Sequence, residues 1–356
     1  MRAVRSTSKS PGIAPDSSPR RVALIGFGLA GAVIHAPLIE TTPGLRLTTI
    51  VTGDPERAVR ARREYPEAAV EPEAEAVWAR AAEHGLVVIA APNSAHVPLA
   101  RRAIDEGLAI VVDKPLAPSS AEARELTERA AAAGVALTVF QNRRWDSDFL
   151  TLRQLIDSGE LGEIHRFESR FERWRPELQD SAWRESASRA EGGGLLLDLG
   201  THLIDQALVL FGPVSEVYGE ADHRRGGRAD DDVFLALRHE SGVRSHLWAS
   251  SVAASRGPRM RVLGSHGAFV VDQPDGQEEE LASGRRPRDA SWGAEPEEGW
   301  GRLVRGDEQR LVRPQNGDWP EFYRRLSASL DGRGELPVDP RDAVATLEIL
   351  ERIGDD

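Results

Sequence analysis

Arg21-Val22-Ala23-Leu24-Ile25 leads directly into Gly26-Phe27-Gly28-Leu29-Ala30-Gly31, three glycines at the GxGxxG spacing. In such a turn the first glycine permits a tight bend, the second lets the backbone approach a pyrophosphate, and the third allows close contact between helix and strand. The amides at the start of the following helix then face the phosphates. A second apolar run, Leu47–Thr52, follows a Pro43-Gly44 turn. This strand, turn, helix and strand context predicts a dinucleotide-binding unit.

The end of that second strand should set the cofactor preference, because an acid there binds the ribose 2′-hydroxyl and repels a 2′-phosphate. Thr52 stands where the acid is commonest, and Gly53 and Asp54 follow it. Asp54 either binds the ribose hydroxyls of NAD or caps the helix that follows. Arg57 lies at the start of that helix, where it could bind the 2′-phosphate of NADP. NAD and NADP both stay open, and we lean slightly to NADP.

The alternation of strands and helices continues after this unit. Further strands are expected at 86–91, 109–112 and 136–140, separated by helices at about 96–106 and 120–133. Such spacing predicts parallel crossovers and a doubly wound α/β sheet, which binds ligands at the carboxyl ends of its strands. The residues at those ends are Pro92-Asn93, Asp113-Lys114-Pro115 and Gln141-Asn142-Arg143.

A second cluster of polar residues lies on an apolar helix that follows Gly192-Gly193-Gly194. Asp198, His202 and Asp205 fall at i, i+4 and i+7, which would place them on one helix face. Asp198 as a helix cap and His202 as a core histidine are the structural alternatives. Three glycines leave room for a ligand or cofactor, and an aspartate and a histidine near a lysine can move protons on a carbinol.

The composition restricts the class of protein. The 356 residues are 40% hydrophobic and 29% charged, which suits a globular chain of two domains. The 45 Lys and Arg against 57 Asp and Glu give a net charge of −12, which disfavours nucleic-acid binding by the surface at large. No cysteine is present, which fits a reducing cytoplasm, and we assign no metal site.

The beginning of the chain is expected to lie outside the fold. Residues 1–20 are rich in Ser, Pro and Arg without apolar periodicity, and we predict a disordered tail there. The apolar run Val22–Ile34 is too short to span a bilayer, so we predict a buried strand and helix, and a cytoplasmic protein without a membrane partner.

The second half of the chain predicts a different architecture. We expect a dinucleotide-binding domain at 21–141 and an α+β domain at 142–339, with an open, mostly antiparallel sheet. Its strands are expected at 164–174, 214–221, 232–240, 243–253 and 259–272. Residues 273–318, rich in Gly and Pro, are expected to form a long loop or lid. Residues 340–353 carry an apolar stripe typical of a helix packed on the body.

The motifs together resemble the glucose–fructose oxidoreductase, inositol dehydrogenase and MocA (Gfo/Idh/MocA) family over about residues 20–353. The resemblance is carried by Gly26–Gly31, Pro92-Asn93-Ser-Ala-His96, Asp113-Lys114-Pro115 and Gly192-Gly-Gly-x3-Asp198-x3-His202. Asp113 departs from the glutamate that is usual in the family. Further segments resemble the NADP-dependent scyllo-inositol dehydrogenase-like members of the family. These segments are His35-Ala-Pro37, Asn142-Arg-Arg-Trp-Asp146, Arg173-Trp-Arg-Pro176, Asp275-Gly-Gln277, Ser291-Trp-Gly293 and Gln315-Asn-Gly-Asp-Trp319. One departure from these members is Gly53-Asp54, which stands where they often have Ser-Arg.

The resemblance implies an NAD(P)-dependent dehydrogenase or reductase. Lys114, Asp198 and His202 would form the catalytic set: His202 would exchange the hydroxyl proton, Lys114 would stabilise the developing alkoxide, and Asp198 would orient substrate and support the imidazolium. Pro92, Asn93 and His96 would join the cofactor site. The resemblance also implies a homodimer or homotetramer through the open face of the sheet.

A sugar or cyclitol substrate would lie between the domains. We expect this substrate to contact Asp198, His202, Asn142, Arg143, Trp145, Arg173, Trp183 and Asn316. The alternative for the two tryptophans is a place in the core, and the alternative for the two arginines is a solvated or paired position at the surface. Two other interpretations stay open: the same enzyme class acting on a natural-product, dihydrodiol or enone substrate, and a non-catalytic protein that senses a dinucleotide.

Overall fold

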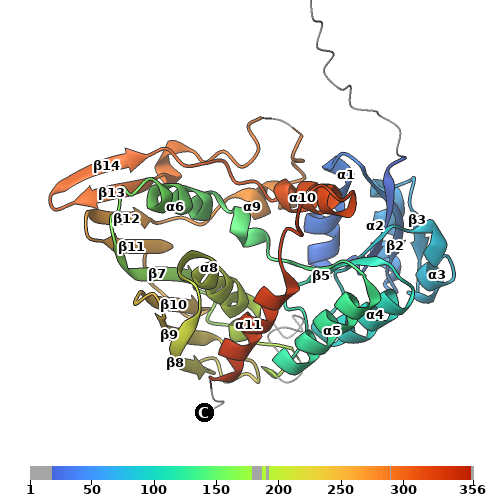
Figure 1. Cartoon of the computed structure of the whole chain (residues 1–356), viewed down its shortest axis with the longest axis horizontal. Coiled ribbons are helices and arrows are strands. Elements are labelled where there is room, and N and C mark those ends of the chain that lie inside the picture. The colour runs from blue at the N-terminus through green and yellow to red at the C-terminus, as the bar shows by residue number, and fades with distance from the viewer. Residues whose placement is uncertain (1–17, 179–186, 190–191, 289, 354–356) are drawn as a thin grey trace, which may run out of the picture.

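The computed structural model describes residues 18–178, 187–189, 192–288 and 290–353. Figure 1 shows two sheets side by side, a helix-covered sheet formed within residues 20–140 and a second sheet with helices on its inner face. The six strands of the first sheet are parallel, in the order β3-β2-β1-β4-β5-β6. They are β1 (Arg20–Ile25), β2 (Leu45–Val51), β3 (Ala69–Glu71), β4 (Leu86–Ile89), β5 (Ala109–Asp113) and β6 (Leu137–Phe140).

Helices connect these strands as right-handed crossovers require. The glycine turn leads into a π-helix, η1, which continues as α1. These helices and the short ones beside them are η1 (Ala30–His35), α1 (Ala36–Thr41), α2 (Pro55–Glu64), α3 (Glu75–Trp78), η2 (Ala81–Glu83), α4 (Asn93–Asp105) and α5 (Ser120–Ala133). The strand order reverses between β1 and β4, so the predicted doubly wound parallel sheet is confirmed and its binding crevice lies at that point.

The second sheet has eight strands in the order β14-β13-β12-β11-β7-β10-β9-β8. All neighbours are antiparallel except β7 and β10, so the predicted open, mostly antiparallel sheet is also confirmed. Its strands are β7 (Ile164–Glu172), β8 (Val214–Asp222), β9 (Asp232–His239), β10 (Arg244–Ser250), β11 (Met260–Gly264), β12 (Gly267–Val271), β13 (Gly301–Arg305) and β14 (Glu308–Val312).

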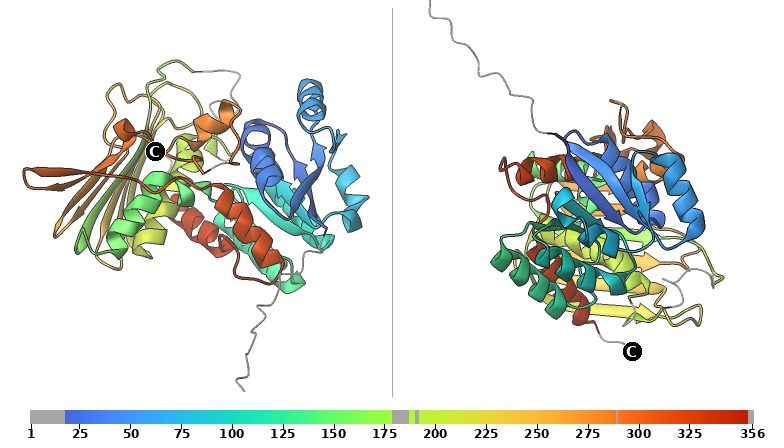
Figure 2. Two further views of the ribbon diagram at one scale, coloured as in Figure 1. Left: turned by 90° about the horizontal axis from the view of Figure 1, so that it is seen from above. Right: turned by 90° about the vertical axis from the view of Figure 1, so that its right-hand side faces the viewer.

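The helices of this half are η3 (Asn142–Trp145), α6 (Ser147–Asp157), η5 (Leu196–Gly200), α8 (Thr201–Phe211), α9 (Gln277–Ala282), η6 (Glu297–Gly299), α10 (Pro320–Leu330) and α11 (Pro340–Glu351). Among them, α8 lies against the inner face of the sheet, in contact with β7 and β10 (Figure 2). η5 is a π-helix that runs directly into α8. Within the described residues, no helix has the length and apolar character needed to cross a membrane.

The expectation of a long loop or lid at 273–318 is wrong. This segment contains α9 and the strands β13 and β14, which extend the sheet. β14 is an edge strand with the sequence Glu308-Gln-Arg-Leu-Val312, four of whose residues are exposed. An exposed edge strand has no alternation of buried and solvated side chains, and this alternation is the signal on which strand prediction depends.

The chain returns to the first half at its end. α10 packs against α1, and α11 packs against both α5 and α8. Aromatic rings join the two halves: Phe140 contacts His35, Phe322 and Tyr323, with ring centroids 4.3 to 5.9 Å apart. At the other end of the chain Arg20 is the first residue of β1, so the predicted tail ends before it, and residues 1–17 lie outside the described residues.

Candidate active site

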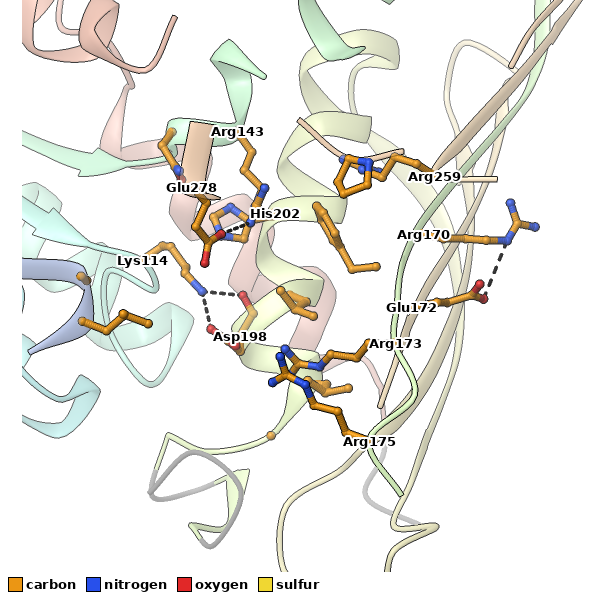
Figure 3. A pocket seen from close by; sticks show the side chains of 18 of the residues that line it. Lys114, Arg143, Arg170, Glu172, Arg173, Arg175, Asp198, His202, Arg259 and Glu278 are labelled. Atoms are coloured by element: carbon orange, nitrogen blue, oxygen red, sulfur yellow. Dashed lines mark hydrogen bonds and ion pairs between the residues drawn. The ribbon is translucent and has the colours of Figure 1, made fainter. Parts of the chain in front are cut away.

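A cavity of about 530 Å³ lies between the two sheets. Its walls include Leu29 and Ala30 of the glycine turn, Lys114 at the end of β5, and Asp198 and His202 of the η5–α8 helix. Figure 3 shows Lys114 and Asp198 pointing toward one another, with His202 further along the same helix. The carboxyl ends of the parallel strands therefore face the second domain across this cavity.

The glycine turn has the close contacts that the sequence predicts. Gly26 has a φ of 102°, and a Cβ there would lie 2.3 Å from the carbonyl oxygen of Ala90 on the adjacent strand end. A Cβ on Gly31 would lie 2.0 Å from the carbonyl oxygen of Gly26. Gly28 has open space instead, with only Arg57 Nη1 at 3.6 Å. The turn is thus a cradle closed at its first and third glycines and open at the second, which fits a pyrophosphate.

The side chains around the turn contribute unequally. Phe27 is buried and packs edge-on against Tyr65, with ring centroids 6.0 Å apart, so it offers the cradle only its backbone. Thr52 is buried at the end of β2 and Gly53 is exposed. Asp54 caps α2 by accepting a hydrogen bond from Arg57 N at 3.0 Å, and its carboxylate lies 3.7 Å from Arg57 Nε.

Asn93 and His96 hold neighbouring segments in place. Pro92 is exposed and precedes α4. Asn93 Nδ2 donates to the carbonyl oxygen of Gly192 at 2.8 Å, which ties α4 to the glycine segment of the second half. The ring nitrogens of His96 lie 2.7 Å from the oxygen of Pro115 and 3.0 Å from that of Ala91, and burial lowers the pKa of His96. His96 thus joins the ends of β4 and β5 and does not line the cavity.

Lys114 and Asp198 form the central contact of the cavity. Lys114 Nζ donates to Asp198 Oδ1 at 2.5 Å and to the Asp198 carbonyl oxygen at 2.6 Å. His202 is 4% exposed and lines the same cavity. The expectation that Asp205 shares their face is wrong, because Asp205 accepts two hydrogen bonds from Arg144, at 2.8 and 2.6 Å, away from the cavity.

The three glycines before this helix lie in close contact with other parts of the protein. The sequence analysis expected them to leave room for a ligand or cofactor instead. A Cβ on Gly194 would lie 1.9 Å from Asp230 Oδ2, and one on Gly192 would lie 2.9 Å from Asn93 Cβ. Asp230 in turn accepts a hydrogen bond from Leu196 N at 2.6 Å and so caps η5. Burial raises the pKa of Asp230. Close packing around this segment therefore fixes the start of the helix that carries Asp198.

Behind Lys114 lies a buried polar group that the sequence analysis did not assign to the site. Asp113 Oδ1 accepts a hydrogen bond from Lys114 N at 2.9 Å and lies 3.9 Å from His35 Nε2. His35 Nδ1 is 2.6 Å from the hydroxyl of Tyr323. Burial would raise the pKa of Asp113, but His35 and Lys114 outweigh burial and hold this pKa below its usual range. Asp113 is therefore an anion that fixes the backbone of Lys114.

The expected substrate residues separate into two groups. Asn142, Arg143 and Arg173 line the cavity. Trp145 lies in the core, edge-on to Phe322 at 5.9 Å, and Asn316 is exposed and donates to the carbonyl oxygens of Ala290 and Trp292. Neither of these two lines the cavity. Trp183 lies outside the described residues.

Several charged residues of the cavity were missed. Arg175, Arg225, Arg256, Arg259 and Glu278 all line it. Arg175 had a usable signal, because it lies two residues after Arg173 and directly beyond the strand expected at 164–174, where a continued extended chain places both side chains on one face. Arg225 and Arg256 lie in segments between strands, where spacing carries no information about direction.

Below the cavity floor lies a cluster of buried acids. Asp146 Oδ1 accepts a hydrogen bond from Trp319 Nε1 at 2.8 Å, and Asp146 Oδ2 lies 3.4 Å from Arg143 Nη1. Burial raises the pKa of Asp146 to about 7, with Arg143 opposing and Asp148 adding to the shift. Asp275 also has a pKa well above its usual range because of burial and the charge of Asp146. Asp146 therefore binds a proton near neutral pH.

A nucleotide-binding turn that faces proton-carrying side chains across an interdomain cavity is what a two-domain dinucleotide-dependent oxidoreductase requires, and the fold and cavity define that class. Comparison with known families agrees: residues 20–141 match the model described as "Oxidoreductase family, NAD-binding Rossmann fold", and residues 149–270 match the "GFO/IDH/MocA C-terminal domain". The chain belongs to the GFO/IDH/MocA oxidoreductase family.

Individual relatives cover almost the whole chain. It is 40% identical over 334 residues to an uncharacterized oxidoreductase, YdgJ, of Escherichia coli (93% of this chain, 94% of the relative). It is 33% identical over 335 residues to the scyllo-inositol 2-dehydrogenase (NADP(+)) IolW of Bacillus subtilis (93% and 92%). Among solved structures, the putative oxidoreductase yvaA of Bacillus subtilis is similar with a TM-score of 0.86 and 32% identity (94% and 96%).

Proposed function

We propose that this protein transfers a hydride between nicotinamide C4 of NAD(P) and a secondary carbinol or ketone of a sugar or cyclitol. The observation that carries the proposal is the Lys114–Asp198 contact of 2.5 Å in a cavity that also exposes His202 and the glycine turn. The name of the inositol dehydrogenase relative supports the substrate class. When bound, the nicotinamide supplies or accepts the hydride.

The side chains of the protein handle the proton. His202 accepts the proton of the substrate hydroxyl during oxidation and returns it during reduction, because a neutral imidazole is a suitable base near neutral pH. Lys114 donates a hydrogen bond to the reacting oxygen and stabilises its developing negative charge. Asp198 holds Lys114 Nζ in place through two oxygens. The catalytic role of Asp198 is thus partly to keep the ammonium group aimed into the cavity.

We propose NADP as the preferred cofactor. Asp54 is engaged as the cap of α2 and by Arg57, which reduces its capacity to repel a phosphate. Arg57 Nη1 lies 3.6 Å from the Cβ position of Gly28, so its guanidinium reaches the glycine turn. A positive, planar group at this place suits a 2′-phosphate.

We also propose that the protein self-associates through the outer face of the eight-stranded sheet. In the part of the chain that the structure describes, helices lie on the inner face of this sheet and leave the outer face uncovered (Figure 2). The outer face carries an aromatic row in which Phe234 contacts Tyr218, His246 and Trp248, with ring centroids 5.1 to 6.4 Å apart. Tyr218 is 58% exposed in the single chain. A second copy of the chain would cover this apolar surface.

The experiment that tests the activity is the substitution His202→Asn. We expect kcat/KM to fall by about 10²-fold to 10⁴-fold, because a positioned acid or base is lost. Reduced-cofactor absorbance with an inositol and sugar panel, using NAD and NADP in parallel, measures turnover, and fluorescence titration measures the Kd of the reduced cofactor, which should stay the same.

His165→Asn is the matched control, because His165 is exposed on β7 and outside the cavity. Unchanged turnover in His202→Asn would remove His202 from the mechanism. Tight cofactor binding by the unmodified protein without turnover of any panel member would favour the dinucleotide-sensing alternative.

A further inference from the structure

The charge of the cavity differs from that of the whole chain. Eight of the side chains that line it are Lys or Arg and six are Asp or Glu. The chain itself has 45 Lys and Arg against 57 Asp and Glu. Positive charge is thus concentrated where the substrate must bind.

The acids of the cavity already have partners within the protein. Asp198 is bound to Lys114, Asp230 to Leu196 N, and Glu278 to Arg143 Nη2 at 3.0 Å. The others contact main-chain amides or arginines: Asp113 with Lys114 N, Glu172 with Gly257 N at 2.7 Å, and Asp272 with Arg302 at 2.7 Å. Two cations have no such partner: the side chains of Arg175 and Arg256 make no hydrogen bond or ion pair with any residue that the structure describes.

The strand extension after β7 aims two arginines into the cavity. Arg173 N and Arg175 N donate to the carbonyl oxygens of Ser250 and Ser251, at 2.9 and 2.7 Å, so the chain stays extended here. Residues two apart on an extended chain point to the same side. Figure 3 shows Arg173 and Arg175 reaching from this strand toward Asp198.

Contacts to the main chain hold the segments that carry these arginines in place, while the side chains of Arg175 and Arg256 are exposed. Arg225 Nη1 donates to the carbonyl oxygens of Arg175 and Glu177, at 3.3 and 3.4 Å, while its Nε pairs with the fully buried Asp231 at 3.0 Å. Glu172 fixes the loop that carries Arg256 by accepting from Gly257 N. Arg173, Arg175 and Arg256 thus lie on segments with a fixed main chain in the lining of one cavity.

We infer that the substrate carries an anionic group, a carboxylate or a phosphate, that Arg173, Arg175 and Arg256 bind. The inference rests on the oxidoreductase function proposed above and specifies its substrate as a charged sugar or cyclitol derivative. A guanidinium binds carboxylate or phosphate through two parallel hydrogen bonds and stays charged at any physiological pH. The acidic group would lie on the sheet side of the cavity, opposite Lys114 and His202.

The phosphates of the cofactor are the competing anion, and the fold separates them from these arginines. The pyrophosphate cradle is formed by Gly26–Gly31 of the first domain. Arg173 and Arg175 come from the extended segment after β7, and Arg256 comes from the β10–β11 connection, both in the second domain. A substitution at Arg175 should therefore leave cofactor binding unchanged.

The first test measures binding without turnover. Inorganic phosphate is titrated by calorimetry into the protein saturated with reduced cofactor. We expect Arg175→Gln to weaken phosphate binding by about 10-fold to 100-fold, the value of one or two charge-assisted hydrogen bonds, and Arg175→Lys to weaken it less. Arg153→Gln, an exposed arginine of α6 outside the cavity, is the control and should bind like the unmodified protein. Equal phosphate binding by Arg175→Gln, or a matching loss of cofactor affinity, would overturn the inference.

The second test compares matched substrates: D-glucose, D-glucuronate and D-glucose 6-phosphate, each with NAD and NADP. We expect a charged member to have a kcat/KM about tenfold or more above glucose, and Arg175→Gln to remove that difference by raising KM. The two charged members distinguish carboxylate from phosphate. Preference for glucose, retained in the variant, would overturn the inference. Arg175-dependent phosphate binding without any turnover would support the anion site and count against the proposed activity.

Discussion

At the scale of single residues, the Lys114–Asp198 pair is the contact that joins the two halves of the site. Lys114 is fixed by the end of β5 and by Asp113, whereas Asp198 is fixed by the capped start of η5. Each partner therefore depends on a different sheet for its position. Removing either side chain would leave the other charge in a cavity wall without its counter-ion, which is costlier than the loss of one exposed pair.

Arg57 is the residue on which the proposed cofactor preference depends. We expect Arg57→Leu to lower kcat/KM for NADP by about 10-fold to 100-fold, because a charged hydrogen bond to phosphate is lost. The value for NAD should change little. Steady-state kinetics with both cofactors measures the ratio, and Arg62→Leu, exposed on the same helix, is the control. An equal loss with both cofactors would show that Arg57 does not select between them.

Asp146 should make the stability of the fold depend on pH. Its pKa is about 7 in the folded protein and near 4 in an unfolded chain, so protonation favours the folded state. This contribution is complete below about pH 4 and is lost as the pH rises through 7. Urea unfolding at pH 5.5 and pH 8 should show a decrease of about 1 to 2 kcal/mol that Asp146→Asn lacks. An equal decrease in the free energy of unfolding between pH 5.5 and pH 8 in the unmodified protein and in Asp146→Asn would contradict the role of Asp146.

Some residue positions could be predicted and others could not, for physical reasons. Lys114 could be predicted because it stands at the end of an expected strand. Asp198 and His202 could be predicted because they are one helical turn apart on an apolar helix, and both signals are local in the sequence. Trp145 was expected at the substrate but lies in the core, because sequence does not say which side of a short 3-10 segment faces the cavity. Arg256 depends on a hydrogen bond between Gly257 and Glu172, 85 positions apart, which no local pattern reveals.

At the scale of elements, two π-helical segments lie beside the cavity. η1 follows the glycine turn and η5 precedes α8, and both supply residues to the cavity wall. A π-helix closes its hydrogen bonds over five residues instead of four, so positions beyond it rotate relative to an ideal α-helix. Asp198 lies within η5, so ideal α-helical spacing does not describe its direction relative to His202 and Asp205 of α8.

Five of the six parallel strands were predicted, whereas β3 and the edge of the second sheet were not. β4 is buried at all four positions and β6 likewise, and such apolar runs are distinct in any sequence. β13 and β14 lie at the open edge, where charged residues are compatible with a strand because water solvates them. Burial, which comes from the rest of the fold, is thus what makes a strand predictable.

At the scale of the whole molecule, the proposed self-association can be tested directly. We expect the unmodified protein to have the mass of a dimer or tetramer in light scattering, and the double variant Tyr218→Lys/Phe234→Lys to have the mass of one chain. Charged side chains in the aromatic row would be buried without partners on association. Val59→Lys is the control, because Val59 is 64% exposed on α2 of the first domain. A monomeric unmodified protein would refute this proposal.

The placement of α11 has a consequence for the synthesis of the protein. This last helix packs against α5 and against α8, which carries His202, and Arg189 Nη1 donates to the carbonyl oxygen of Ile353 at 2.9 Å. The first sheet is complete by residue 140 and can fold while translation continues, since domains fold from the N-terminus. Because α11 follows the first sheet in the chain, a nascent chain acquires its nucleotide-binding half before the helix that carries His202 obtains the support of α11.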